Sequence, residues 1–209
     1  MESLGLFGAF ALQLFLIVDP VAGVPVFLAI TPRNSPEERR RMAVRGCLAA
    51  FLVLLFFLLA GPPLLRYFGI ETASVRIGGG ILLFVIALEM LYGRPTGTGT
   101  SRREERMAGA KRDISITPLA VPLLAGPGAI ATCLIFSAQA SAADWLALPA
   151  ALATVLAITA LLLRRADDLV RWLGDLGTAV LVRIMGLLLA FLSVQYVVDG
   201  VRAVLEKAA

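Results

Sequence analysis

The chain has 209 residues, 59% of them hydrophobic and 16% charged, and its mean hydropathy of +0.87 is far above that of a soluble domain. It contains no histidine, which removes the commonest general base and metal ligand, so we expect neither an enzyme nor a resident metal or cofactor. The net charge is +4, and most of the basic residues lie in connections between the apolar segments. This distribution is typical of cytoplasmic loops, so we expect no nucleic-acid partner.

Long apolar runs predict six membrane-spanning helices, because about 20 apolar residues cross the roughly 30 Å of bilayer hydrocarbon. The predicted spans are approximately Leu4–Ile30, Met42–Leu65, Ile77–Tyr92, Ile114–Gln139, Trp145–Leu163 and Thr178–Val198. The N-terminus lacks a positive n-region and a small-residue cleavage site, so we expect the first span to be retained. The predicted fold class is an all-α polytopic membrane protein with one membrane domain, 1–209.

The first span carries its own interruption. Pro20 and Pro25 flank Gly23, and two prolines with a glycine between them are predicted to open the helix. Asp19-Pro20 is typical of an N-cap followed by the first helical residue, and Asp19 is the only acid deep within a span. A charge there usually faces a cavity or a partner. Asp19 is therefore predicted either to cap a half-helix or to contact a substrate ammonium, a proton or a cation.

The next two spans give weaker functional signals. Ser35-Pro36 with Glu38 is typical of a capping box, which starts the second helix before it enters the membrane. Arg76 and Glu89 lie near the two ends of the third span and are secondary candidates for ligand contact; anchoring at the interface is the alternative. Residues 94–113 contain Gly-Thr-Gly-Thr and mixed charge, which predicts a solvated linker.

The fourth span repeats the proline pattern. Pro122 and Pro127 have the same four-residue gap, Gly126 lies between them and Gly128 follows. Thr117-Pro118 is predicted to be a second N-cap with its first helical residue. Within a bilayer, opened backbone is tolerated only where it is buried in protein or lines a cavity. Interrupted spans in corresponding halves are a sequence pointer to a transporter binding site.

A second repeat links the third and sixth spans. The block from Ser74 to Phe84 aligns without gaps with the block from Leu181 to Phe191, with Val, Arg, Ile, Gly, Leu and Phe coinciding at six positions. This alignment pairs Arg76 with Arg183, another secondary candidate. Because each half has three spans, the second half must enter from the opposite face. We therefore predict two inverted three-helix repeats, about 1–93 and 114–209, joined by a linker at about 94–113.

Basic residues predict the orientation. Fourteen of the 19 fall in three connections: Arg33, Arg39, Arg40, Arg41 and Arg45; Arg94, Arg102, Arg103, Arg106, Lys111 and Arg112; and Arg164, Arg165 and Arg171. The positive-inside rule places these odd-numbered connections in the cytoplasm, so both termini are expected on the outer side.

These motifs resemble the MarC family. Residues 19–28 are similar to its D-P-x-G-N-x-P-x-F segment, and residues 116–130 are similar to its second motif almost residue for residue. The resemblance covers about Leu4 to Arg202 and implies a six-span prokaryotic inner-membrane protein, with some members classed as transporters of small neutral amino acids. This chain has Ala22-Gly23 where the family usually has Gly-Asn, so no asparagine amide can act at Gly23.

The sequence thus predicts a secondary transporter of small neutral amino acids or related metabolites, working by alternating access. The expected partners are the substrate, a coupling proton or Na+, the lipid bilayer and a second copy of the chain, because glycines on the third and sixth spans allow close helix approach. Two alternatives are a passive channel and a thiol-redox protein using Cys47 and Cys133. Buried inert thiols are the interpretation that we favour for that pair.

Overall fold

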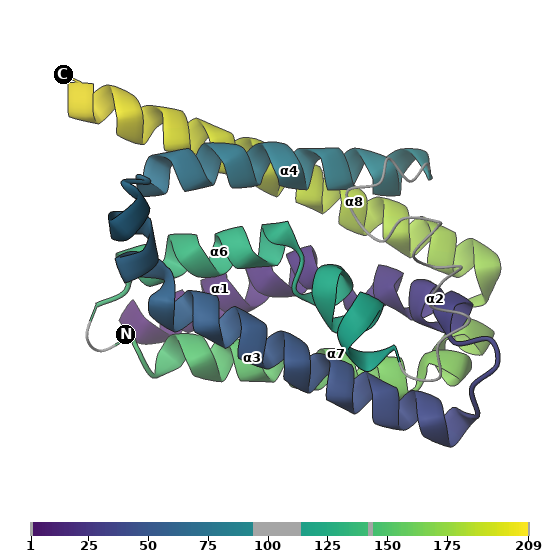
Figure 1. Ribbon diagram of the computed structural model, residues 1–209. Helices are drawn as coiled ribbons and strands as arrows, with labels where there is room; N and C mark the ends of the chain where they lie inside the picture. Colours follow the sequence, from purple (N-terminus) through teal and green to yellow (C-terminus); the bar gives the residue numbers. More distant parts are fainter. Residues whose placement is uncertain (1, 94–113, 142–143, 209) are drawn as a thin grey trace.

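A computed structural model describes residues 2–93, 114–141 and 144–208 of the chain (Figure 1). Within these residues every regular element is a helix. In chain order they are α1 (Glu2–Val18), α2 (Pro20–Ile30), α3 (Pro36–Phe68), α4 (Thr72–Tyr92), η1 (Ser115–Leu124), α6 (Pro127–Gln139), α7 (Ala147–Arg164) and α8 (Ala166–Ala208). The predicted linker lies outside the described residues.

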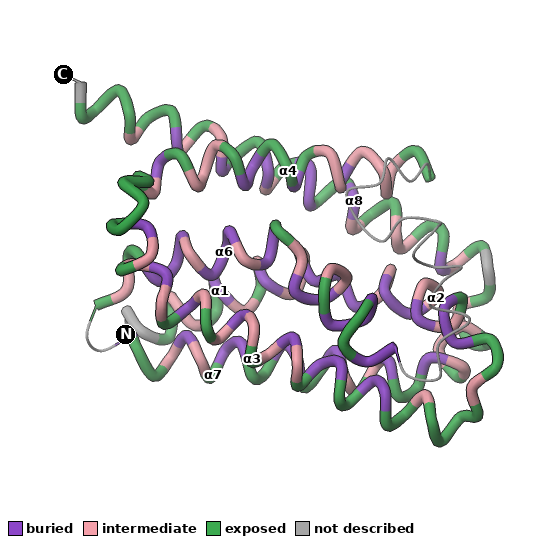
Figure 2. The backbone as a smooth tube through the Cα atoms, in the orientation of Figure 1, coloured by how far each residue is buried: buried purple, intermediate pink, exposed green. Residues whose placement is uncertain are grey.

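The described helices account for six candidate spans. Five segments are long and apolar enough to cross a bilayer, and η1 with α6 forms a sixth span that is bent by 60°. Large apolar side chains such as Leu48, Phe56 and Phe191 are exposed, where lipid would cover them. Figure 2 shows exposed residues recurring along the helices. The prediction of an all-α polytopic membrane protein is confirmed.

Two helix boundaries depend on local signals. Ser35 Oγ accepts a hydrogen bond from the Glu38 amide at 3.3 Å, and the Ser35 amide donates to Glu38 Oε2 at 2.8 Å, so the predicted capping box is present. The last span starts close to its predicted position. Gly174, with φ 64° and ψ 175°, interrupts the helical backbone of α8, and the apolar segment that follows runs from Leu176 to Lys207, against the predicted Thr178–Val198.

Helices from the two halves of the chain interlock. α3 packs on η1 and α6, while α7 packs on α1 and α2. α4 and α8 lie along each other at one edge of the molecule (Figure 1), with α4 also touching α6 and α8 touching α2. Each unbroken helix therefore supports the broken span of the other half, which places both interruptions inside the protein.

The first and fifth connections and the helix start that follows the third connection share one end of the molecule. Arg39 at the start of α3 forms an ion pair of 2.6 Å with Asp167 at the start of α8, which joins the first and fifth connections. Arg45 lines a hollow together with Ser115 and Thr117, just after the third connection. At the opposite end, Lys207 pairs with Glu71 at 2.5 Å. The predicted orientation requires the basic connections to lie on one face of the membrane, and this arrangement is consistent with that requirement.

The orientation itself is a testable prediction. A cysteine replacing Arg33, in the first connection, should be protected from an impermeant maleimide in intact cells and react after permeabilisation. A cysteine replacing the exposed Ile70, in the second connection, should react without permeabilisation. The native Cys47 and Cys133 are buried, so the unmodified protein is a low-background control. The reverse labelling pattern would overturn the orientation.

Candidate functional site

The first span is broken at Asp19. This residue has a left-handed conformation, φ 42° and ψ 68°, which ends α1 at Val18 and lets α2 begin at Pro20. Its Oδ1 accepts a hydrogen bond from the Ala22 amide at 3.2 Å. Asp and Asn tolerate the left-handed region better than other non-glycine residues, and proline is suited to the first helical position. Asp19-Pro20 is thus the N-cap pair that the sequence predicts.

Gly23 and Pro25 do not open the helix, contrary to the prediction. α2 continues through both residues to Ile30. Pro20 occupies a position where an amide would have no helical partner, so only Pro25 removes a helical hydrogen bond. The carbonyl of Val21 is then left without its usual donor from the following turn. The break precedes the proline pair instead of lying within it.

The second interruption is more irregular. Inside η1, Thr117 and Val121 have extended backbone angles, and each precedes a proline, Pro118 and Pro122, in a cis peptide bond. Residues before proline are pushed out of the helical region by steric contact with its ring. Thr117 is exposed, and because Val121 is extended again four residues later, no regular helix begins after Thr117. The prediction that Thr117 caps a helix is therefore wrong. α6 begins at Pro127 with Gly126 as its N-cap.

The positions of the breaks define a different register for the repeat. Pro20 and Pro127 each begin a helix, and they are 107 residues apart, as are Arg76 and Arg183. Matching the proline pairs as written would give 102 residues between Pro20 and Pro122. A single separation of 107 residues therefore aligns the first span with the fourth and the third span with the sixth. The four-residue gap that the two proline pairs share does not identify equivalent positions in the two halves.

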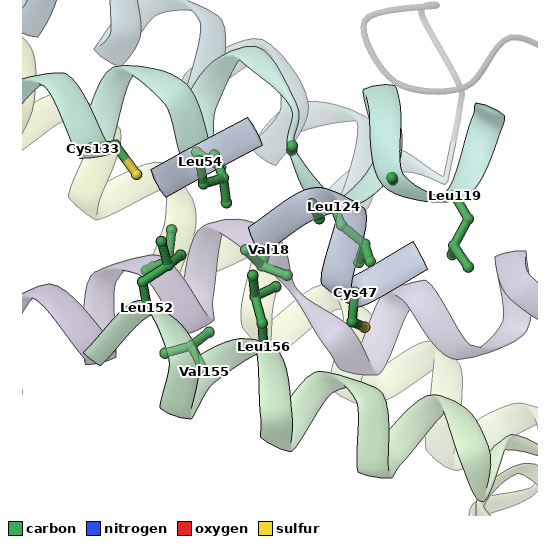
Figure 3. Packing of buried hydrophobic residues seen from close by; sticks show 14 of the residues in the cluster. Val18, Cys47, Leu54, Leu119, Leu124, Cys133, Leu152, Val155 and Leu156 are labelled. Carbon is green, nitrogen blue, oxygen red and sulfur yellow. The ribbon is translucent and has the colours of Figure 1, made fainter. Parts of the chain in front are cut away.

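The two interruptions meet in the interior. Gly128, in the first turn of α6, is buried, and a Cβ built on it would overlap Cδ2 of Leu83 and lie 3.3 Å from Cγ2 of Ile17. Ile17 is two residues before Asp19. Val18 and Leu124, which end the segments before the two breaks, belong to one buried cluster (Figure 3). We call the region formed by Asp19, Pro20, Gly23, Gly126, Pro127 and Gly128 the break site.

Asp19 presents an unused acceptor at the break site. The residue is 7% exposed, and its Oδ2 has no hydrogen-bond partner among the described residues. Gly23, one turn along α2, is buried, yet a Cβ built on it meets nothing within 4 Å. A buried carboxylate oxygen without a partner is costly, so the natural complement is a cation, an ammonium group or a proton. No neighbouring side chain packs against Gly23 beside the first turn of α2.

The start of α6 has the opposite character. Its N-cap is Gly126, and no side chain caps the helix. Pro127 has no amide hydrogen, so the amides of Gly128 and Ala129 are the first donors, at the positive end of the helix. A helix N-terminus without a side-chain cap is suited to bind a carboxylate. The break site therefore combines an acceptor from the first half of the chain with donors from the second half.

A polar network that the sequence did not reveal ends at the break site. The Tyr196 hydroxyl donates to Gln13 Oε1 at 2.6 Å and lies 3.5 Å from Thr132 Oγ1, which itself donates to the Gly128 carbonyl at 3.0 Å. These contacts connect α1, α6 and α8. For Tyr196 the only signal in the sequence is a tyrosine within the last apolar run.

The secondary candidates lie away from the break site. Arg76 is half-buried beside Gly200, at one end of the α4–α8 pair. Arg183 is exposed near Gly186, which packs on Met90 at the other end. Glu89 is half-buried in the same end of α4. Nothing in these positions brings the three side chains to Asp19, and in the described part of the chain no group of three His, Cys, Asp or Glu residues could hold a metal.

These features define a polytopic α-helical membrane protein whose two broken spans meet in its interior. The chain belongs to the MarC family, since the model of MarC family integral membrane proteins matches residues 4–205.

Relatives cover nearly the whole chain. A UPF0056 membrane protein of Methanocaldococcus jannaschii is 38% identical over 92% of this chain and 94% of its own length, and one of Aquifex aeolicus is 36% identical over 99% and 97%. The inner membrane protein YhgN of Escherichia coli is 36% identical over 92% and 94%. No solved structure matches the chain.

Proposed function

We propose that this protein is a secondary transporter of small neutral amino acids or related small metabolites, located in a prokaryotic inner membrane like the protein named YhgN. The observation that carries the proposal is the buried, unpartnered Oδ2 of Asp19 at the point where the first span breaks. A buried acceptor of this kind in a membrane span is typical of substrate and ion pathways.

The two helix starts fit the two charges of an amino acid. The substrate ammonium would bind Asp19 Oδ2, with the Val21 carbonyl, freed by Pro25, as a second acceptor. The substrate carboxylate would bind the amides of Gly128 and Ala129 at the start of α6. Ile17 and Gly128 approach each other closely, so the groups come from neighbouring segments. A coupling proton or Na+ would compete for or share the Asp19 carboxylate.

Asymmetry between matched contacts supports alternating access. In the 107-residue register, α1 corresponds to η1 and α2 to α6. The contacts of α3 with η1, α3 with α6 and α4 with α6 then match those of α7 with α1, α7 with α2 and α8 with α2. Three contacts lack an extensive counterpart: α1 with α6, where Phe10 and Phe136 have ring centroids 5.0 Å apart, α1 with α8, and α7 with α8. Their equivalents, α2 with η1, α4 with η1 and α3 with α4, are marginal at most. If the two halves exchanged these contacts, the site would open to the opposite side of the membrane, as in transporters built from inverted repeats.

The two alternatives are distinguished by different observations. The thiol pair is disfavoured by distance, because Gly61 of α3 contacts Leu134 and Ser137 beside Cys133, whereas Cys47 lies 14 residues earlier in α3, about 21 Å along its axis. A disulfide requires the Cα atoms to be within about 7 Å. A passive channel is the second candidate function, and a transport experiment distinguishes it from a secondary transporter.

The experiment is transport into proteoliposomes. A thermal-shift screen of the purified protein against amino acids, Na+ and pH would first select ligands, because a ligand of the folded state raises the melting temperature. Uptake of the selected amino acid should then saturate and, with an ion gradient, exceed the external concentration. Uptake that never saturates and stops at equal concentrations would identify a channel. The absence of any stabilising amino acid would contradict the proposed substrate class.

A further inference from the structure

Four arginines gather around one hollow at the basic end of the molecule, away from the break site. The hollow has a volume of about 330 Å³ and is lined by Arg40, Arg41 and Arg45 of α3, Arg164 of α7, and Val44. We call it the arginine hollow. Among the described residues, no acidic side chain lines it, and no hydrogen bond or ion pair occupies the side chains of Arg40, Arg41 and Arg164. The hollow therefore attracts an anion.

A neighbouring hollow shows how the charges are balanced nearby. Arg40 and Arg164 also line this second space of about 320 Å³, where five arginines accompany Asp167 and Asp168, a surplus of three positive charges. Asp167 is already paired with Arg39, which ties α8 to α3. The positive-inside rule explains why basic residues occupy this end, but it does not require them to surround a hollow.

An apolar groove continues from the arginine hollow into the membrane. Val44 lines both spaces. The groove runs between α3 and α7, has a volume of about 300 Å³ and is lined by Cys47, Leu48, Phe51, Ala153, Leu156, Ala157 and Ala160 as well as Val44. From Val44 to Phe51 it extends about 10 Å along α3. Three of the four α7 residues that line it are alanines, whose small side chains leave room for a hydrocarbon chain.

We propose that the arginine hollow and this groove together bind one anionic phospholipid. The phosphate lies among Arg40, Arg41, Arg45 and Arg164, where guanidinium groups form charge-assisted hydrogen bonds, and one acyl chain follows the α3–α7 groove. Basic pockets between membrane helices at the cytoplasmic surface are suited to anionic headgroups. A free phosphate would need only the hollow, whereas the continuous apolar groove fits a lipid. Because α3 and α7 each support a broken span, the lipid stabilises the contact between the two halves.

The test is lipid titration of the purified full-length protein in neutral detergent, read as melting temperature and as retained lipid in native mass spectrometry. Dioleoylphosphatidylglycerol should raise the melting temperature more than dioleoylphosphatidylcholine. The double variant Arg40→Gln, Arg164→Gln should bind the anionic lipid on the order of thirtyfold more weakly, from the contribution of each basic residue near an anionic surface. Arg66→Gln, at the other end of α3, is the matched control and should bind normally.

A second pair of variants tests the groove. Ala157→Trp fills it and should weaken binding of the anionic lipid by on the order of tenfold, because the acyl chain loses its buried surface. Ala150→Trp, on α7 outside the groove, should not. Equal loss in Arg66→Gln and in the double variant would show general charge attraction and overturn the site. Normal lipid binding by Ala157→Trp, or inorganic phosphate alone producing the full stabilisation, would overturn the lipid assignment.

Discussion

Asp19→Asn is expected to reduce transport by on the order of tenfold to a hundredfold while the protein still inserts and folds. The amide keeps the shape of the side chain, and asparagine is among the best N-cap residues and also tolerates the left-handed conformation at this position. What it removes is the charge at Oδ2, and hydrogen bonds to charged groups contribute about 1.5–3 kcal/mol. Uptake of the selected amino acid into proteoliposomes measures the effect.

The pH dependence and two further variants make this result interpretable. If the carboxylate acts in its charged form, acidification should slow the wild type, and Asp19→Asn should lose that dependence. Asp19→Ala removes the cap as well as the charge, so it should lower both melting temperature and transport. Asp199 is a partly exposed acid near the end of α8 that accepts a hydrogen bond from Gln195. Asp199→Asn should leave uptake unchanged. Equal rates and equal pH dependence in wild type and Asp19→Asn would make Asp19 a structural residue.

Gly128→Val is expected to give the second large effect, a loss of both stability and transport. A side chain at this buried position would overlap Leu83 of α4 and crowd Ile17 of α1, where the two interruptions meet. Overpacking of a well-packed core typically costs about 1–3 kcal/mol. It would also block the first amides of α6 from a ligand. Melting temperature in detergent and uptake in proteoliposomes report the two losses separately.

Matched glycine variants separate crowding from any effect of valine in a helix. Gly78→Val lies on an exposed part of α4 where a Cβ meets nothing within 4 Å, so it should be tolerated. Adding Leu83→Ala to Gly128→Val removes the side chain that the new methyl groups would overlap, and should restore part of the melting temperature. A Gly128→Val protein as stable and active as wild type would show that close approach at this position is unimportant.

The sequence predicts only part of the break site. It predicts the cap at Asp19-Pro20 because capping depends on a few consecutive residues. Thr117-Pro118 has the same local form but does not cap, because the next proline, Pro122, keeps η1 from forming a regular helix. Gly23 and Pro25 show the converse error, since a proline after an established first turn removes a hydrogen bond without ending the helix.

The sequence by itself determined the membrane class, the six apolar spans, the capping box at Ser35 and the pairing of Arg76 with Arg183. Each depends on hydropathy or on neighbouring residues, which act before tertiary packing. Only the tertiary structure decided where the chain breaks, that Gly128 meets Leu83 and Ile17, that Tyr196 joins Gln13 and Thr132, and that four arginines surround one hollow. These depend on which helix faces come together, because side chains far apart in sequence become neighbours only when α3 and α7 cross to the opposite halves.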